Sequence, residues 1–436
     1  MLNIRKKIRN IICFLSDRKF FWSIMLAYVF IKLLPVLAFD KRFTYLVIII
    51  SFFILILRII KVIVYDKKII VNKYRIISIV FILICLLSVL YNTGFNLYNL
   101  NIKNPEYRVL IVLMINLFIL FSFDTDNNYN KDIKYLDKIS LTIVIFSFFN
   151  ILFSIYDTII NKRDRIWGLT GSVWSFTHFV AISFAINLYL LIKEKKYLLR
   201  LFYFINLFLH LITLIFTQQR AGYLCIIIGF LLLLLLLVLV GRINEFKNCL
   251  IKNNKMVVLV IVILIFFMIL ISHYINLKII AAKVLNLSSS GRIDIIKISL
   301  KNLLDNKAFL FGLIGNLHKI DVNVESQKLQ ILTSEGSFHN IYICILIFFG
   351  IIAFVVFILF IIIIIKKLIL LVEKSKTDED IFDLLILSCF GVIGSLVSAF
   401  FDDNMIINLP YLSNLMFFIL CSIISSIDEK RIDNVK

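Results

Sequence analysis

The sequence predicts an all-α polytopic membrane protein, and three observations carry that prediction. Of the 436 residues, 61% are hydrophobic and the mean hydropathy is +1.00, which is more apolar surface than a soluble domain can bury. The apolar runs repeatedly reach the ~20 residues with which a helix crosses a bilayer. They also lack the alternation of polar and apolar residues that a membrane β-barrel requires. One helical membrane domain over residues 1–436 is therefore expected.

About twelve predicted spans follow one another, separated by charged residues or by Asn and Gly clusters. The basic start of the chain, MLNIRKKIRNIICFLSDRKFF, has no small-residue cleavage site, so we interpret it as a retained amphipathic segment in the cytoplasm. The predicted spans lie at roughly 20–39, 43–64, 76–91, 109–123, 139–160, 174–192, 201–216, 221–241, 256–275, 340–365, 382–401 and 405–427.

The formal net charge of +20 is explained by the distribution of the basic residues. With the amino terminus inside, 29 of the 47 Lys and Arg residues fall in cytoplasmic segments, against eight in the short outer segments. This positive-inside bias predicts that both termini are cytoplasmic, and it leaves little reason to expect a nucleic-acid partner. The seven cysteines lie in apolar runs or short basic loops, so no disulfide framework is expected.

One connection is far longer than the others. Residues 276–338, between the ninth and tenth predicted spans, form a long extracytoplasmic loop, and loops of this length are more often functional than passive. Within it, Ile296, Leu300, Leu303 and Leu304 recur at helical spacing. This pattern predicts an amphipathic helix that lies on the outer membrane surface or on the bundle.

Arginines on the outer side run against the positive-inside bias and need another explanation. Arg163 and Arg165 occupy a short outer loop, Arg220 lies in the tight turn TQQRAG, and Arg292 follows the linker SSSG. The guanidinium fork suits bidentate binding of phosphate. Structural roles are the alternatives: a headgroup contact for Arg163 and an ion pair with Asp164 for Arg165. For Arg220, the polar turn between two spans favours a side chain that faces a cavity.

His339 lies at the start of the tenth predicted span, directly before residue 340 on the outer side, where the positive end of the helix favours a neutral ring that can accept a proton. A helix cap or a headgroup contact is the alternative. His178, in the sixth predicted span, is interpreted as a packed or hydrogen-bonded residue. Asp402 and Asp403 could act as a base or balance the charge of the outer arginines; a solvated turn is the simpler interpretation. No spacing matches a metal site and no glycine pattern matches a nucleotide site, so no metal or cofactor is expected.

Four short motifs occur in an order typical of one family. A basic loop with GLTG precedes a middle span, TQQRAG follows two spans later, and the long loop opens with SGR and closes with HNIYICILIFFGIIAF. This order, over roughly 165–365, resembles the O-antigen ligase and Wzy-type polymerase superfamily. The resemblance implies a GT-C-like membrane glycosyltransferase that acts on polyprenyl-pyrophosphate-linked sugars outside the cytoplasmic membrane.

The resemblance also implies roles for three residues. By position, Arg220 matches the family's catalytic-site arginine, Arg292 the loop arginine, and His339 the histidine proposed as base. The chain departs from the family pattern at three places: Gln219 stands where Ser is common, Thr177-His178 replaces a Pro-Asn, and a loop Gly-x-Gly is loosened to Gly312 and Gly315.

A chemical hypothesis uses these residues. The sugar already carries pyrophosphate as a leaving group, so Arg220 and Arg292 would stabilise the departing charge, with Arg163 or Arg165 in support. His339 would deprotonate the attacking hydroxyl in an inverting transfer that needs no metal or nucleotide. The remaining predicted contacts with the acceptor are Asn340 and His178.

The expected function is polymerisation of lipid-linked oligosaccharide repeat units into O-antigen or capsule at the bacterial inner membrane, with the active site extracytoplasmic. The expected partners are the lipid-linked donor and acceptor, membrane lipid, and flippase and chain-length regulator proteins. A ligase that transfers a finished glycan to a lipid, protein or wall acceptor is one alternative. A transporter or flippase of lipid-linked sugars is another, but the sequence shows neither the internal repeats nor the interrupted spans typical of transporters.

Overall fold

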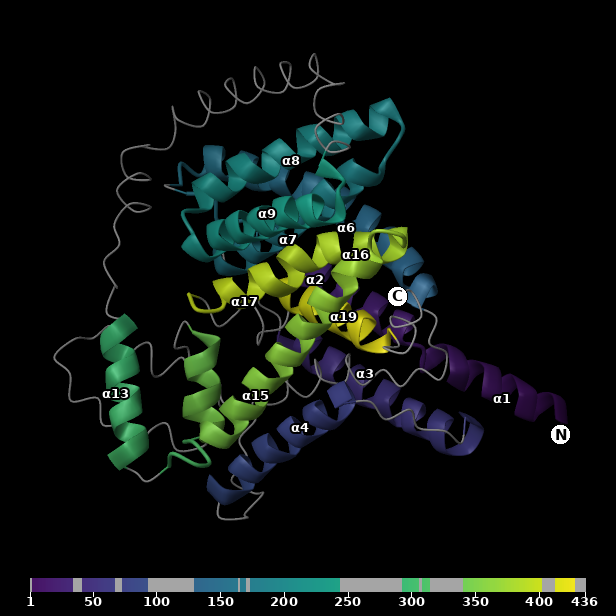
Figure 1. Cartoon of the computed structure of the whole chain (residues 1–436), viewed down its shortest axis with the longest axis vertical. Helices are drawn as coiled ribbons and strands as arrows, with labels where there is room; N and C mark the ends of the chain where they lie inside the picture. Colours follow the sequence, from purple (N-terminus) through teal and green to yellow (C-terminus); the bar gives the residue numbers. More distant parts are fainter. Residues whose placement is uncertain are drawn as a thin grey trace.

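The computed structural model describes residues 2–33, 41–66, 73–92, 129–163, 165–169, 173–243, 292–305, 308–313, 340–401 and 412–427. Within these ranges every regular element is a helix and none is a strand, which confirms the predicted all-α class (Figure 1). Six helices there are long and apolar enough to cross a membrane, so the chain is a multi-pass membrane protein. These candidate spans are Lys131–Ile160, Phe176–Lys193, Tyr197–Thr217, Arg220–Val240, Ile341–Lys374 and Glu379–Ser398.

The described helices coincide with the predicted spans, except that the helix Tyr129–Ile160 begins ten residues before the predicted 139–160 and the helix Ile341–Lys374 continues nine residues beyond the predicted 340–365. Two predicted spans, 109–123 and 256–275, lie outside the described residues, and a total of twelve stays a prediction. The helices are α1 (Leu2–Leu15), α2 (Arg18–Lys32), α3 (Lys41–Ile60), η1 (Lys61–Asp66), α4 (Lys73–Asn92), α6 (Tyr129–Ile160), α7 (Val173–Lys193), α8 (Tyr197–Thr217), α9 (Arg220–Val240), α13 (Arg292–Asp305), α15 (Ile341–Lys374), α16 (Glu379–Ser388), η4 (Cys389–Gly394), α17 (Ser395–Ser398) and α19 (Leu412–Ser426).

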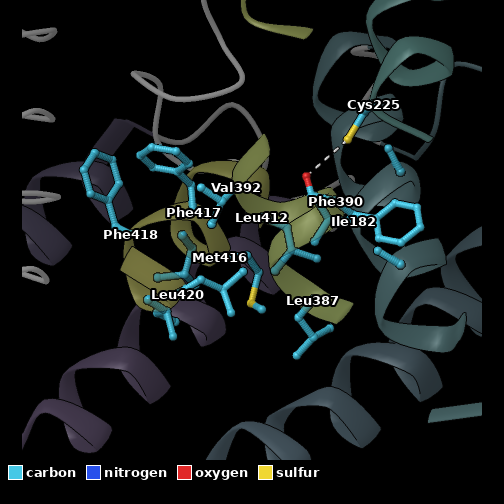
Figure 2. Packing of buried hydrophobic residues seen from close by; sticks show 14 of the residues in the cluster. Ile182, Cys225, Leu387, Phe390, Val392, Leu412, Met416, Phe417, Phe418 and Leu420 are labelled. Carbon is cyan, nitrogen blue, oxygen red and sulfur yellow. Dashed lines mark hydrogen bonds between the residues drawn. The ribbon is translucent and has the colours of Figure 1, made fainter. Parts of the chain in front are cut away.

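The centre of the bundle is the π-helical turn η4, which joins α16 to α17 and packs against α9, α7 and α19. Phe390 of η4 is fully buried and lies against Phe184 of α7, with ring centroids 6.3 Å apart. A Cβ atom at Gly229 of α9 would lie 2.2 Å from the Phe390 ring, so the missing side chain lets α9 approach η4 closely. Figure 2 shows buried hydrophobic residues around Phe390, with the Cys225 thiol donating to the Phe390 carbonyl at 3.7 Å.

One end of the bundle, which we call the Lys193 end, is tied together by polar side chains of three helices. Lys193 of α7 forms ion pairs with Asp137 of α6 at 2.9 Å and with Asp383 of α16 at 2.6 Å. The Tyr189 hydroxyl donates to Asp383 at 3.2 Å and also to Asp137. These bonds connect α6, α7 and α16 where the apolar parts of the helices end.

The opposite end, which we call the Arg220 end, holds the turn between α8 and α9. Because α9 has 21 residues, its two ends are about 30 Å apart. The end of α17 and the start of α15 also lie here, since the Ile341 amide donates to the Ala399 carbonyl at 3.0 Å. Figure 1 shows α13 on the same side of the molecule, away from α1.

Helix α15 is interrupted, so the expectation of uninterrupted spans is wrong for this element. Gly350 has φ 82° and ψ −179°, which is not helical, nine residues after the helix begins at Ile341. The periodicity of an apolar run does not reveal such a break, because the side chains on both sides of it are equally apolar. The segment 308–313, from the predicted long loop, lies against the break.

The amphipathic helix predicted within 276–338 is present as α13. Leu303 is fully buried and α13 contacts α15, which confirms that the helix packs on the bundle. Leu304, predicted on the same apolar face, is 61% exposed instead. Successive residues on a helix are about 100° apart, and here Leu304 lies outside the part of the helix surface that is buried at Leu303. The limits of the long loop, 276–338, stay a prediction.

Candidate functional site

The turn between α8 and α9 consists of two residues, Gln218 and Gln219. Gln218 adopts the left-handed conformation with φ 58°, and its amide donates to the Ile215 carbonyl at 3.3 Å. The Tyr223 hydroxyl of α9 donates to the same carbonyl at 2.8 Å, which ties the two helices across the turn. Arg220 is therefore the first residue of α9, half-buried at the positive end of that helix.

The predicted basic loop before α7 packs against this turn. The Ile166 amide donates to the carbonyl of Phe216, in the last turn of α8, at 3.0 Å, and the Ile166 side chain is buried. Gly168 has φ 73°, and a Cβ atom there would lie 2.5 Å from the Phe176 ring, so glycine is required for the chain to enter α7 at this angle.

Arg165 is half-buried in the same loop, next to Trp167. Its guanidinium carbon lies 4.6 Å from the centroid of the Trp167 ring, a cation–π contact that was not among the predicted roles of Arg165. Trp167, two residues after Arg165, was the feature of the sequence that could have indicated this contact. The Nε atom of Arg165 is buried and has no hydrogen-bond partner among the described residues. A bound anion or water molecule that accepts a hydrogen bond from this atom would remove the free-energy cost of burying an unsatisfied donor.

Arg163 lies differently from Arg165. It pairs with Asp157 at the end of α6, at 3.1 Å, and the Asn161 amide donates to the same carboxylate at 2.7 Å. The sequence offered Arg165 and Asp164 as the ion pair of this loop, but Asp164 lies outside the described residues. The observed pair with Asp157 gives Arg163 a structural partner, and its predicted contact with pyrophosphate stays a prediction.

The first turns of α9 are held close to α7 and to α17. A Cβ atom at Gly222 would lie 2.4 Å from the Thr177 methyl group, and one at Gly394 would lie 2.8 Å from the Cys225 carbonyl oxygen. His178, beside Thr177, is 1% exposed, which confirms the interpretation of this histidine as a packed helix residue. Its predicted contact with an acceptor is not tested by the structure.

The start of α15 is fixed to the end of α17. Asn340 is the N-cap of α15, because its side-chain oxygen accepts from the amides of Tyr342 at 3.0 Å and Ile343 at 3.1 Å. Its side-chain amide donates to the Phe400 carbonyl at 3.2 Å. The Tyr342 hydroxyl donates to the Leu396 carbonyl at 2.9 Å. The capping role considered for His339 therefore belongs to Asn340.

A continuous series of contacts thus joins the candidate residues that the structure describes. It runs from the loop of Arg165 through the turn before Arg220, then along α9 to α17, and from α17 to Asn340 at the start of α15. These residues lie at one end of the bundle, the Arg220 end.

Other candidate residues are described only in part or not at all. Arg292 is the first residue of α13, and nothing beyond its backbone is described. His339, Asp402 and Asp403 lie outside the described residues. Across the part of the chain that the structure describes, no group of three or more His, Cys, Asp or Glu residues is arranged to hold a metal ion.

Comparison with known protein families gives a match over part of the chain. Residues 205–358 match the family model described as O-antigen ligase. The matched segment begins in α8 and ends in α15 beyond Gly350, so it includes Arg220, Arg292 and His339. No curated protein matches the chain. The match supports the superfamily that the order of the motifs indicates.

Proposed function

We propose that this member of the O-antigen ligase and polymerase superfamily is an oligosaccharide repeat-unit polymerase. It joins polyprenyl-pyrophosphate-linked repeat units into O-antigen or capsule through a metal- and nucleotide-independent, inverting transfer. The observation that carries the proposal is the geometry of the α8–α9 turn. There, a half-buried arginine begins a helix, and a second half-buried arginine lies in the loop that is bonded to the last turn of α8, directly before this turn.

The leaving group is the first chemical demand. When the bond between the anomeric carbon and the pyrophosphate oxygen breaks, the electron pair stays on the pyrophosphate, which gains negative charge. Arg220 lies at the positive end of α9, so its guanidinium and the helix dipole can stabilise that charge together. Arg165 adds a second guanidinium from the adjacent loop, and Arg292 adds a third under this proposal.

The nucleophile is the second demand. The attacking sugar hydroxyl loses a proton, which His339 accepts in the proposed mechanism. The structure bears on this assignment through Asn340, to which His339 is joined by a peptide bond. Asn340 is held by the cap of α15 and by its bond to Phe400, so the backbone on one side of the proposed base has a defined place at the Arg220 end.

The proposal assigns the Arg220 end to the outer face of the inner membrane and the Lys193 end, with both termini, to the cytoplasm. The excess of Lys and Arg in the cytoplasmic segments supports this orientation. The donor and acceptor are then lipid-linked oligosaccharides that reach the site from the outer leaflet. Flippase and chain-length regulator proteins would be partners in supplying the repeat units and in setting product length.

The ligase alternative uses the same bond chemistry and differs only in the acceptor. Purified protein in proteoliposomes, given a lipid-linked repeat unit as the sole substrate, distinguishes the two. A ladder of products of increasing length is expected. Product that forms only after a second acceptor is added would assign the chain to the ligase function instead.

The interruption of α15 is a structural observation that bears on the transporter alternative. In transporters, interrupted helices leave backbone groups that bind substrate or ions. Here the segment 308–313 fills the break, and protein donors bond the carbonyls of Ile347 and Phe349. Movement of intact lipid-linked sugar across liposomes, without any change to the sugar, would favour the transporter over the polymerase.

A further inference from the structure

The break in α15 is filled by a second segment of chain that takes over its backbone hydrogen bonds. The Leu313 amide donates to the Ile347 carbonyl at 2.7 Å, and the Ile351 amide donates to the Phe309 carbonyl at 2.9 Å. An uninterrupted helix would satisfy these groups within itself. The segment 308–313 and the residues around Gly350 therefore form one paired unit, which we call the Gly350 joint.

Two glycines make the joint possible. A Cβ atom at Gly350 would lie 2.1 Å from the Leu310 carbonyl oxygen, and one at Gly312 would lie 2.3 Å from the Phe348 carbonyl oxygen. Both residues also have positive φ, 82° at Gly350 and 71° at Gly312. Each position therefore requires glycine for two reasons, the backbone conformation and the close approach of another backbone.

Helix α4 closes the joint from a third side. The Ser88 hydroxyl donates to the Phe349 carbonyl at 2.9 Å, and the Asn92 side-chain amide donates to the Phe311 carbonyl at 3.2 Å. Non-helical backbone inside a membrane protein persists where neighbouring segments satisfy its polar groups. Because side chains and backbone of this protein supply the donors, the joint is a rigid support and not a binding site.

The joint holds one end of a short helix whose other end lies at the candidate site. Residues Ile341 to Phe349 form a half-helix about 14 Å long. At its start, Asn340 and Ile341 are bonded to α17; at its finish, Phe349 is bonded to α4 and Ile347 to the segment 308–313. Both ends are therefore fixed to elements that are distant in sequence.

We infer that Gly312, Gly350, Ser88 and Asn92 are positioning residues for glycosyl transfer. They hold the half-helix, and hence the backbone joined to the proposed base His339, at a set distance from Arg220. This inference rests on the proposed function. We expect its main effect on catalysis, because Arg220 and Arg165, two of the arginines proposed to bind pyrophosphate, lie on α9 and the 165–169 loop and not in the joint. A misplacement of ~1 Å costs about 10²-fold in rate.

The first test replaces each glycine with alanine in the full-length protein reconstituted in proteoliposomes. Gly350→Ala and Gly312→Ala are expected to lower kcat about 10²-fold while the KM for the lipid-linked donor stays within twofold. Gly241→Ala is the matched control. Gly241 has the same kind of φ, 81°, but nothing lies within 4 Å of its Cβ position, so the backbone strain is comparable and the contact is absent. An equal loss in Gly241→Ala would overturn the inference.

A second pair of variants avoids any steric clash. Ser88→Ala and Asn92→Ala each remove one hydrogen bond to the joint, and each is expected to lower kcat about threefold to tenfold. Ser78→Ala is the control on the same helix, because the buried Ser78 hydroxyl donates to the carbonyl of Tyr74, one turn earlier in α4. Wild-type kcat in both Ser88→Ala and Asn92→Ala would contradict the positioning role.

Hydrogen exchange separates failure of the joint from failure of the proposed function. Peptides covering 341–349 should exchange faster in Ser88→Ala than in the wild type, whereas peptides of α8 and α9 should not change. Unchanged exchange would overturn the joint itself. Faster exchange with unchanged kcat would overturn positioning while leaving the polymerase intact. A wild-type protein that makes no polymer would overturn the proposed function and, with it, the catalytic part of this inference.

Discussion

The substitution Arg220→Ala tests the proposed catalytic site directly. It removes one guanidinium from the place where, in the proposed mechanism, charge develops on the leaving pyrophosphate, but it leaves the start of α9 and Arg165 in place. Removing a single donor of this kind typically lowers kcat about 10²–10³-fold, which corresponds to about 2.7–4 kcal/mol. Alanine is the best helix former, and α9 keeps its close contact with α7 at Gly222, so insertion and abundance should not change. Arg220→Lys keeps the positive charge but loses the bidentate guanidinium, so its kcat should lie between those of the wild type and Arg220→Ala.

The same helix provides the control. Arg242, just past the other end of α9, pairs with Glu379 at 2.7 Å and lies 4.5 Å from the Phe382 ring centroid. The Glu379 side chain is 72% exposed, so the pair contributes at most about 1 kcal/mol. Arg242→Ala removes an arginine about 30 Å from the candidate site and should leave turnover within twofold.

The assay measures polymer formed from a lipid-linked repeat unit in proteoliposomes with equal amounts of inserted protein. The reasoning is refuted if Arg220→Ala turns over within twofold of the wild type, or if Arg242→Ala loses as much activity. Either result would mean that the α8–α9 turn does not hold the leaving group.

Three further substitutions have defined outcomes. His339→Ala should abolish polymer formation in a protein that is inserted and abundant, and full-length polymer from that variant would refute the assignment of the base. Arg292→Lys should slow turnover in vitro, because lysine cannot bind phosphate through two parallel hydrogen bonds; an unchanged rate argues against that contact. Asn340→Ala should destabilise the start of α15 by about 1 kcal/mol, seen as a lower midpoint of thermal unfolding, and Asn340→Asp should restore it because aspartate also caps helices. Equal stability of wild type and Asn340→Ala would contradict the capping role.

The helices could be predicted from the sequence because a bilayer imposes a simple rule on it. A segment that crosses needs ~20 apolar residues in a helix, and this requirement is local. The pairing of Gly312 with Gly350 is not local. Both glycines stood in the motifs FGLIG and FFGII, but nothing in either motif indicates that the two backbones meet. The Lys193 end was missed for the same reason, since its ion pairs join three helices that are far apart in sequence.

In the candidate site, the role of a residue could be predicted where the residue type itself indicates that role. An asparagine directly before a long apolar run is a strong N-cap signal, and Asn340 is indeed the cap of α15. The partner of Arg163 was not predictable in the same way. Asp164 was the nearest carboxylate in sequence, but Asp157 is brought close to Arg163 by the chain reversal at the end of α6. That reversal depends on Lys162, which has φ 48°, an uncommon conformation for lysine.

The position of Arg220 is set by packing along the whole of α9 and not by the turn alone. Gly222 places α9 against Thr177 of α7, and Gly229 places it against Phe390 of η4. Gly394 brings α17 to the Cys225 carbonyl between those two contacts. Since the start of α15 is bonded to residues at the end of α17, a continuous series of contacts connects the arginine that would hold the leaving group to the N-cap of α15. A transfer reaction requires a leaving-group site and a base at a fixed separation, and helix α9 with its glycine contacts provides the frame that maintains it.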